Sequence, residues 1–339
     1  MKITVIGSGG WGLAMAKLLA EKGHQVFVWS HKTETTALLR RNHTNPKLLP
    51  GVLLPETIHF TDRIDDAADA RIVILATPSY AVAETCTLLA PILTEQQTLV
   101  LLSKGFDLEH HCCLLSDTVA QHIGKSCPIV ALTGPSHAEE VSRDIPTAVV
   151  AASPDRAAAE LVQRELSNRF FRIYTSPDLV SAELGGAMKN IMAVAVGISD
   201  GFGFGDNTKA MLMTRGIAEM SRLGVLLGGR EETFAGLSGV GDLIVTCISD
   251  HSRNRRAGLL IGRGVSPEDA LTQVGAVVEG YYATRAVHEL TVSRGISMPI
   301  CEAMYQILFE HLPLRDAIGG LFCRANRTEH DSFADSNCW

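Results

Sequence analysis

The sequence predicts an α/β protein in which an N-terminal, doubly wound, mostly parallel sheet is followed by an all-helical C-terminal domain. Three observations lead to this prediction. In the first half, short apolar runs bounded by turn residues alternate with segments of helical length. A glycine-rich turn, residues 7–12, follows the first of these runs. From Pro177 onward, only long segments with helical spacing remain.

Seven predicted strands account for the N-terminal half. Their apolar runs are too short for helices, and the helix-length segments between most of them are typical of a parallel sheet that is covered on both faces. The predicted strands are residues 2–6, 25–29, 72–76, 98–102, 128–132, 147–152 and 171–175.

The C-terminal half has helical periodicity. Its long apolar-rich segments are residues 181–198, 210–228, 281–295 and 298–310. We therefore expect a dinucleotide-binding domain over residues 1–177 and a helical substrate and catalytic domain over residues 178–325. The polar, aperiodic residues 326–339 are expected to form a mobile tail.

Composition excludes several classes of protein. The net charge of -7 and the absence of a dense basic tract argue against a nucleic-acid surface. The eight cysteines show no CxxC spacing, so we expect reduced thiols and no metal site. Met1 leads directly into the first strand without a signal-like segment, and no apolar run reaches the ~18 residues of a spanning helix. We expect a cytoplasmic protein with no membrane insertion.

The glycine turn predicts a dinucleotide site of the Rossmann-like type. Gly7 permits the tight turn, Gly9 lets the backbone approach a pyrophosphate, and Gly12 lets the helix pack on the strand. The N-terminus of the following helix offers free N–H groups to the phosphates. The alternative is a glycine-rich turn that only packs closely against a neighbour.

The end of the second strand bears on which cofactor is used. A dinucleotide fold usually places a ribose-binding carboxylate there, but the chain reads Ser-His-Lys-Thr-Glu. With His31 and Lys32 at this position, we expect a 2'-phosphate to be tolerated, so that NADPH is used and NADH is also accepted. A solvated turn explains Lys32 equally well.

Polar groups follow the fourth and fifth of the main parallel strands. Lys104 comes just after residues 98–102, and Gly134, Ser136 and Ala138 come just after residues 128–132. Ligands of open α/β sheets bind at this edge, so these residues should face the site that the glycine turn marks. Lys104 is a candidate for holding an anionic substrate, although a plain surface lysine is the alternative.

Lys189 interrupts an apolar helix. Nine of the twelve residues from Ala187 to Ile198 are apolar, which indicates a helix that is buried nearly all round. A lysine in such an interior needs a partner, a ligand or a depressed pKa. Gly185 and Gly186, one turn earlier, leave room for its stem and for a close backbone approach. The alternatives are a lysine that snorkels to solvent or one that pairs for structure alone.

Residues 236–258 hold a second group of candidates. If the segment from Asp242 is helical, Asp242 and Thr246 share one face. Ser252, Arg253 and Asn254 follow, and arginine suits the fork geometry of phosphate recognition. A solvated helix start is an equally good explanation for the two arginines at 255 and 256.

Several motifs, in this order and spacing, resemble a known family. They are GSGGWG, LLSKG, GPSHAEEV, ELGGAMKN, GFGFGDN and GLSGVGDLIVTCISDHSRNRRAG. Together they are similar to the bacterial, soluble type of NAD(P)-dependent glycerol-3-phosphate dehydrogenase, from about residue 3 to about residue 320. The resemblance implies reversible reduction of dihydroxyacetone phosphate to sn-glycerol 3-phosphate for phospholipid synthesis, in a cytoplasmic enzyme that is usually a dimer.

The resemblance also implies roles for individual residues. The implied cofactor contacts, besides the glycines of the turn, are Gly10, Trp11, His31, Lys104, Ala138, Arg253, Val277 and Glu279. The implied substrate contacts are Lys104, Gly134, Ser136, Lys189, Asp242, Ser252, Arg253 and Asn254. Lys189 resembles the family's proton donor and acceptor. Two departures are His137, where an aromatic residue is common, and the tail past Arg327.

The chemistry of ketone reduction is consistent with these roles. A ketone that accepts hydride develops negative charge on its oxygen, which calls for a cation or proton donor. Lys189 suits this catalytic role. Asp242 could hold its ammonium oriented and charged, and Lys104 could act as a second cation. Thr246, on the same predicted face as Asp242, is the fourth catalytic candidate. Two alternatives remain: a β-hydroxyacid dehydrogenase, whose substrate carries a carboxylate, and a regulator that senses NADPH without turnover.

Overall fold

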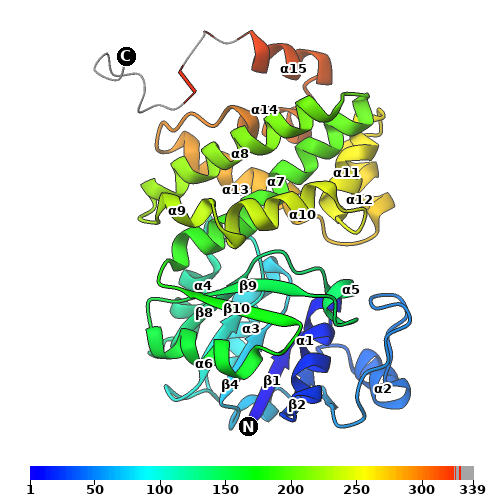
Figure 1. Ribbon diagram of the computed structural model, residues 1–339, viewed down its shortest axis with the longest axis vertical. Coiled ribbons are helices and arrows are strands. Elements are labelled where there is room, and N and C mark those ends of the chain that lie inside the picture. Colours follow the sequence, from blue (N-terminus) through cyan, green and yellow to red (C-terminus); the bar gives the residue numbers. More distant parts are fainter. Residues whose placement is uncertain (324, 326–327, 330–339) are drawn as a thin grey trace.

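The chain folds into a sheet-containing N-terminal half and a helical C-terminal half. The computed structural model describes residues 1–323, 325, 328 and 329. In Figure 1 the sheet and its helices form the lower part of the molecule and the helices from α7 onward form the upper part. The sheet ends at Ser176 and α7 begins at Leu179. The predicted tail at 326–339 lies outside the described residues except for Thr328 and Glu329.

The main sheet has eight strands in the order β10-β9-β8-β5-β4-β1-β2-β3. All neighbours pair in parallel except β8 and β9. The strands are β1 (Lys2–Ile6), β2 (Gln25–Trp29), β3 (His59–Thr61), β4 (Ile72–Leu75), β5 (Thr98–Leu101), β8 (Ile129–Thr133), β9 (Thr147–Ala152) and β10 (Phe171–Ser176). The doubly wound, mostly parallel sheet is therefore confirmed, and all seven predicted strands are present.

Helices cover both faces of this sheet. One face packs on α1 (Gly10–Glu21) and α6 (Arg156–Leu166), and the other packs on α3 (Val82–Leu89) and α4 (Leu115–Ile123). The remaining elements of this half are α2 (Thr33–Asn42), α5 (Ala138–Val141), two short 3-10 helices (Ile64–Ala67 and Ser79–Ala81) and a small hairpin of β6 (Phe106–Asp107) and β7 (Cys113–Leu114). The sequence pattern did not indicate the hairpin or β3, because two- and three-residue strands carry no readable periodicity.

The second half is helical over its described residues, as predicted. Its helices are α7 (Leu179–Phe202), α8 (Asp206–Leu226), α9 (Glu231–Phe234), α10 (Asp242–Ile248), α11 (Arg253–Gly262), α12 (Pro267–Val274), α13 (Glu279–Val292), α14 (Pro299–Phe309) and α15 (Leu314–Phe322). A one-turn π-helix, Leu237–Gly241, leads into α10.

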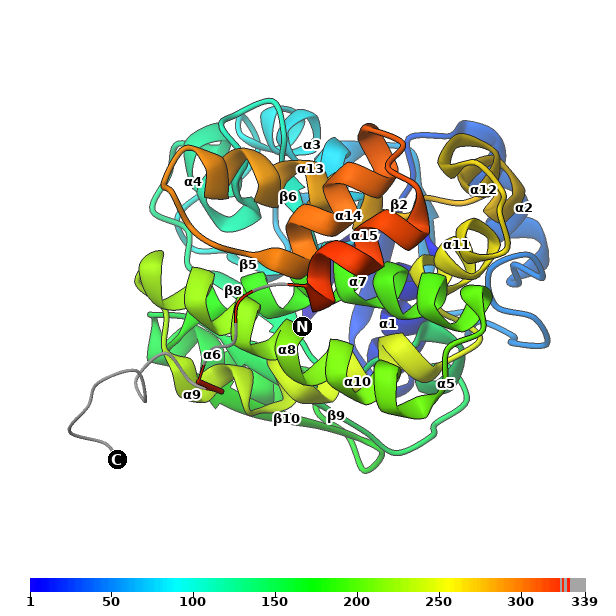
Figure 2. The ribbon, with the colours of Figure 1, turned by 90° about the horizontal axis from the view of Figure 1, so that it is seen from above.

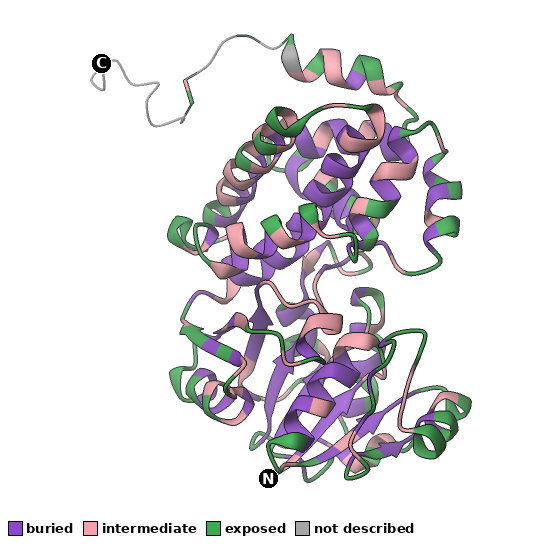
Figure 3. Cartoon of the chain, turned by 45° about the vertical axis from the view of Figure 1, so that its right-hand side comes forward, coloured by how far each residue is buried: buried purple, intermediate pink, exposed green. Residues whose placement is uncertain are grey.

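Helix α7 is the centre of this half. It contacts α8, α10, α11, α13 and α14, which surround it in Figure 2. The buried positions in Figure 3 lie along the strands and the inner helices, while the outer helix faces are exposed. By length and hydropathy α7 could cross a membrane, but 89% of its apolar window is buried inside the fold. It is therefore a core helix and not a membrane span.

Two features fix where α7 begins and how closely it packs. Asp178 caps its first turn by accepting a hydrogen bond from the Ser181 backbone N–H at 3.1 Å. Farther along, a Cβ at Gly197 would lie only 2.2 Å from the Arg255 carbonyl oxygen, so α11 can approach α7 only because residue 197 is glycine. This close packing brings the N-terminus of α11 beside the polar residues of α7.

Candidate active site

Lys189 is buried and its charged group is paired. Its side chain is 9% exposed, and Nζ donates to Asp242 Oδ1 and, at 2.8 Å, to Thr246 Oγ1. The snorkelling alternative is therefore wrong. Asp242 and Thr246 lie one turn apart on the same face of α10, as predicted for a helical segment. Thr246 Oγ1 also donates to the Asp242 carbonyl oxygen at 2.6 Å, so the hydroxyl is oriented toward the lysine by its own helix.

Lys104 reaches the same carboxylate from the sheet. Its Nζ donates to Asp242 Oδ2 at 2.6 Å and to the Gly134 carbonyl oxygen at 3.2 Å. The parallel strands β5 and β8 end side by side, which is why the loops that follow them meet here. The sheet edge and the helical half are thus joined at Asp242.

The two glycines before Lys189 make room for other groups, and not for the stem of Lys189 itself. A Cβ at Gly186 would lie 3.4 Å from the aliphatic chain of Lys104, and one at Gly185 would lie 2.2 Å from the Ser238 carbonyl oxygen. Gly186 therefore admits the second lysine, and Gly185 admits the backbone that leads into α10. The close backbone approach was predicted correctly, whereas the identity of the accommodated side chain was not.

The electrostatics of this cluster favour proton transfer. Burial lowers the pKa of Lys189 to about 8, with the charge of Lys104 acting in the same direction and Asp242 acting against it. Burial works to raise the pKa of Asp242, but the two ammoniums hold that pKa below its ordinary value. A lysine that is poised near neutral pH can both give and accept a proton.

Amide side chains link three helices next to this cluster. Asn190 Oδ1 accepts from Asn254 Nδ2 at 2.8 Å, and Asn254 Oδ1 accepts from the Gly280 backbone N–H at 2.9 Å. Ser252 caps α11 by accepting from the Arg255 N–H at 3.2 Å. Sequence reasoning noted Asn190 only as an interruption of an apolar helix and did not predict this relay.

The basic residues of α11 have different environments. Arg253 is exposed in the first turn of α11. Burial raises the pKa of Glu279, and the positive charge of Arg253 acts to lower it. Arg255 instead forms ion pairs with Asp200 at 2.9 Å and Asp250 at 2.8 Å, which explains it structurally. Arg256 is exposed, as a solvated helix start predicts.

The glycine turn has the geometry that a pyrophosphate needs. Gly7 has φ +119°, and a Cβ there would meet the Ala76 carbonyl oxygen at 2.7 Å, while a Cβ at Gly12 would meet the Gly7 carbonyl oxygen at 2.2 Å. Gly9, the N-cap of α1, has open space around it and no side-chain cap. The first N–H groups of α1 are therefore left for an anion, and the residues present fit a dinucleotide.

The end of β2 carries no carboxylate. Ser8 Oγ donates to Ser30 Oγ at 3.0 Å, which joins the glycine turn to the end of β2. His31 and Lys32 follow and are exposed. This arrangement leaves cationic or neutral donors where a 2'-phosphate would lie.

The other predicted cofactor contacts lie in two places. The Ala138 Cβ would lie 3.8 Å from a Cβ at Gly10, beside the start of α1 and its Trp11. Glu279 begins α13, two residues after Val277, and its carboxylate accepts from the Ser79 hydroxyl at 2.6 Å and from the Ser79 N–H at 3.3 Å. Ser79, which follows β4, was not predicted, because nothing in the sequence pairs residues that are 200 positions apart.

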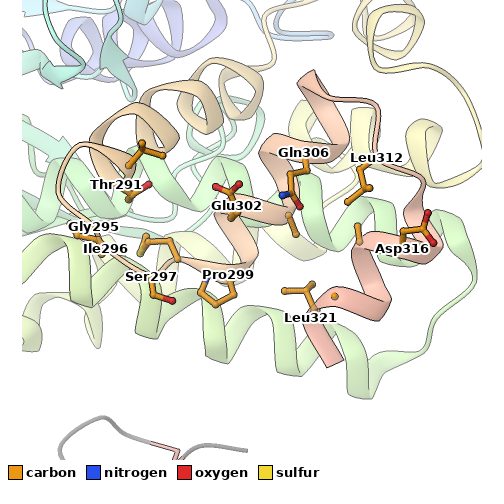
Figure 4. Close-up of a pocket in the computed structure, with 15 residues that line it drawn as sticks. Thr291, Gly295, Ile296, Ser297, Pro299, Glu302, Gln306, Leu312, Asp316 and Leu321 are labelled. Carbon is orange, nitrogen blue, oxygen red and sulfur yellow. The ribbon is translucent and has the colours of Figure 1, made fainter. Parts of the chain in front are cut away.

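A separate groove lies far along the helical half. It has a volume of about 440 Å³ and is bordered by α13, α14 and α15. Figure 4 shows Glu302 and Gln306 on α14 and Asp316 on α15 at its sides. None of the residues predicted for the site lines it, so it is distinct from the Lys189 cluster.

Comparison with known proteins decides the family. The model of the NAD-dependent glycerol-3-phosphate dehydrogenase N-terminus matches residues 2–159, and that of the C-terminus of the same enzymes matches residues 178–319. The chain belongs to the NAD-dependent glycerol-3-phosphate dehydrogenase family.

Relatives and solved structures agree with this membership. Glycerol-3-phosphate dehydrogenase (NAD(P)+) of Moorella thermoacetica is 48% identical, with 97% of this chain and 98% of the relative covered. The enzyme of the same name from Clostridium acetobutylicum is 46% identical over the same shares. The crystal structure of glycerol-3-phosphate dehydrogenase from Coxiella burnetii has a TM-score of 0.91 at 36% identity, covering 95% of this chain and 99% of that one.

More distant structures share only the fold. D-mandelate dehydrogenase in complex with NADH superposes with a TM-score of 0.63 at 15% identity, over 92% of this chain and 98% of that one. This likeness gives no support to a hydroxyacid substrate.

Proposed function

We propose that this chain catalyses the reversible, NAD(P)H-dependent reduction of dihydroxyacetone phosphate to sn-glycerol 3-phosphate. The observation that carries the proposal is the buried Lys189, held by Asp242 and Thr246 and paired across that carboxylate with Lys104. Membership of the glycerol-3-phosphate dehydrogenase family gives the reaction, and this cluster supplies the acid and base that the reaction needs.

The mechanism follows from the charges. The dinucleotide, when bound, would supply a hydride to C2 of the ketone. As the C–H bond forms, the carbonyl π electrons move onto the oxygen, and the Lys189 ammonium gives this oxygen a proton. Lys104 adds a second positive charge that stabilises the developing oxyanion. In the reverse direction the neutral Lys189 amine would remove the hydroxyl proton as C2 gives up its hydride to the oxidised cofactor.

Asp242 keeps both lysines in place. Each of its carboxylate oxygens accepts from one ammonium, and the buried Lys189 cannot turn away from it without leaving its own charge unpaired. The cluster carries one net positive charge when both lysines are protonated, which favours an anionic substrate.

The phosphate of the substrate would lie toward the start of α11. Arg253 there offers a guanidinium, and Ser252 and Asn254 flank it at the helix N-terminus. The dinucleotide would lie across the glycine turn, with its pyrophosphate at the start of α1 and its adenosine ribose near His31. Residues 1–177 would thus hold most of the cofactor, and residues 178–325 would hold most of the substrate, with Lys104 reaching the substrate from the first part.

Three further proposals follow from the family. We infer a homodimer in the cytoplasm whose product supplies phospholipid synthesis. A buried α7, rather than an inserted one, agrees with a soluble enzyme. The size of the assembly is a matter for sedimentation or light scattering on the full chain.

One assay tests the proposed reaction against its alternatives. NADPH absorbance should fall when dihydroxyacetone phosphate is added and should not fall with 3-keto acids. Oxidation of NADPH by a keto acid alone would instead favour a hydroxyacid dehydrogenase. NADPH binding without turnover of either substrate would favour a regulator.

A further inference from the structure

His137 presents an unused acceptor next to the Lys189 cluster. The residue lies in the loop between β8 and α5, and its Nε2 is buried without a hydrogen-bond partner. Its ring lies close enough to Lys189 and Asp242 for both of their charges to affect its pKa. The same loop packs on the start of α10, because Pro135 would lie 3.5 Å from a Cβ at Gly241. His137 therefore lies near the Lys189 cluster, where the substrate is proposed to bind.

The ring is a neutral imidazole with one unpaired nitrogen. Burial, and next the charge of Lys189, lower the pKa of His137, which favours the neutral form. A neutral imidazole carries its single proton on one nitrogen and a lone pair on the other. With the proton on Nδ1, the unpaired Nε2 carries the lone pair and can accept a hydrogen bond.

The other strong acceptors of the site are already engaged. Both oxygens of Asp242 receive lysine ammoniums, and the Gly134 carbonyl oxygen receives Lys104 and the Ser136 hydroxyl. The amide oxygens of Asn190 and Asn254 are also occupied. Among the described side chains of the cluster, hydrogen-bond donors therefore outnumber the acceptors that are still free. Such a site suits the phosphate and carbonyl oxygens of a substrate, which accept hydrogen bonds. A substrate hydroxyl that donates a hydrogen bond has no matched partner among these side chains.

The substrate brings one such hydroxyl. Dihydroxyacetone phosphate has a phosphate, a ketone and a free hydroxyl, of which only the hydroxyl has a proton to donate. We propose that His137 determines specificity for this hydroxyl, which donates a hydrogen bond to Nε2. The inference rests on the proposed function and extends it from the reacting carbonyl to the far end of the substrate.

A pair of substrates isolates this hydrogen bond. Hydroxyacetone phosphate carries a methyl group where dihydroxyacetone phosphate carries the hydroxymethyl group, and the two are otherwise identical. In His137→Phe a flat ring of similar size remains, but the acceptor is gone. This variant should lose about tenfold to a hundredfold in kcat/KM with dihydroxyacetone phosphate, because a buried donor is left unpaired, and should change little with hydroxyacetone phosphate.

Two more variants complete the test. His137→Gln places an amide oxygen near the position of Nε2 and should recover part of the preference for the hydroxylated substrate. His251→Phe is the matched control, because His251 is exposed and its ring centroid lies 6.1 Å from that of His137. It should leave the ratio of the two kcat/KM values unchanged.

The outcomes separate the possible errors. Equal losses on both substrates, or no loss on either, would overturn the proposal. A loss on both phosphorylated substrates but not on unphosphorylated dihydroxyacetone would assign His137 to the phosphate and also overturn it. If the wild-type chain oxidises no NADPH with dihydroxyacetone phosphate, the proposed function itself fails. Should His137→Phe not fold, His137→Ala removes the acceptor without bulk and is read in the same way.

Discussion

Lys104 and Lys189 donate to opposite oxygens of a single carboxylate, that of Asp242. One lysine comes from the loop after β5 and the other from the middle of α7, so this contact joins the two halves of the chain at the proposed reaction centre. Two cations that share one anion leave a net positive charge in a buried place. Burial lowers the pKa of Lys189, and the nearby Lys104 ammonium acts in the same direction, while Asp242 opposes both.

The lowered pKa of Lys189 predicts opposite pH profiles for the two directions of the reaction. Reduction needs the ammonium, so its kcat/KM should fall as pH rises through about 8. Oxidation of glycerol 3-phosphate needs the neutral amine, so its kcat/KM should rise over the same range. Initial rates in both directions at constant ionic strength check this, with NADPH affinity by fluorescence as the control. Profiles that move in the same direction would contradict the assignment of Lys189 as acid and base.

The environment of Glu183 predicts that the free energy of unfolding depends on pH, independently of catalysis. It lies on α7, and its Oε1 accepts from the Ser116 N–H at 3.0 Å, while Oε2 is buried without a partner. Burial raises the pKa of Glu183 from 4.5 to about 7, against the opposing hydrogen bond from Ser116. The folded state thus binds this proton more tightly than the unfolded state does. Its stabilising contribution is full below pH 4.5 and is lost as pH rises to about 7.

Glu183→Gln tests this linkage. The amide keeps an acceptor for Ser116 and cannot ionise, so the free energy of unfolding at pH 8 should rise by roughly 1–3 kcal/mol relative to wild type. Near pH 5 the difference should be small. Urea unfolding at both pH values gives the comparison. Glu219→Gln is the contrasting variant: both oxygens of Glu219 accept backbone N–H groups, from Ile300 and Cys301, so an amide there should destabilise at either pH.

Whether a feature could be predicted from the sequence depends on whether a local pattern brings its residues together or only the packing of distant elements does. The meeting of Lys104 with Gly134 follows from parallel strands that end at one edge, and the shared face of Asp242 and Thr246 follows from helical spacing. Neither pattern states that α10 lies against α7. That contact depends on close helix packing and on the π-helical turn before Asp242.

Polar contacts between residues far apart in the chain could not be predicted from the sequence, for the same reason. Ser79 and Glu279 are joined only when the loop after β4 meets the start of α13. His137 stood out in the sequence only as an unusual residue type. That its Nε2 is buried without a hydrogen-bond partner is evident only in the folded chain. Local periodicity therefore predicted the longer strands and helices, and motifs and strand ends gave the candidate residues, whereas their partners depend on the packing of the two halves.

The end of β2 predicts the cofactor preference. With His31 and Lys32 exposed and no carboxylate at this position, NADPH should be used at least as efficiently as NADH. His31→Asp introduces the missing ribose acid and should shift the ratio of kcat/KM values toward NADH, because the carboxylate repels a 2'-phosphate. The ratio for wild type and variant is the measurement. A tenfold or greater preference of the wild type for NADH would contradict this interpretation.

Arg253 should act on the phosphate of the substrate. Losing a charge-assisted contact typically costs roughly 1.5–3 kcal/mol, or about one to two decades in kcat/KM. Arg253→Gln should therefore impair dihydroxyacetone phosphate far more than unphosphorylated dihydroxyacetone. Arg256→Gln, an exposed change on the same helix, is the control and should alter neither. Equal losses on both substrates would mean that Arg253 serves structure or the cofactor alone.

Lys189→Met tests the centre of the mechanism. Methionine keeps an unbranched stem of similar length and removes only the ammonium. Asp242 retains Lys104 as its partner, and Thr246 still donates to the backbone of its own helix, so folding and NADPH binding should persist. Turnover should fall at least a thousandfold, because general acid catalysis is worth about two to four decades and oxyanion stabilisation adds to it.

The controls for this variant lie in the same half of the chain. Lys209→Met removes a lysine that pairs with Asp200 at 3.1 Å, away from Asp242, and should leave turnover intact. Because Lys189→Met no longer buries an ammonium, its melting temperature should stay close to that of wild type or rise, provided that Lys104 continues to hold Asp242. A folded Lys189→Met that binds NADPH and turns over normally would assign Lys189 to structure. The proton donor would then have to be Lys104, whose Nζ lies on the other oxygen of the same carboxylate.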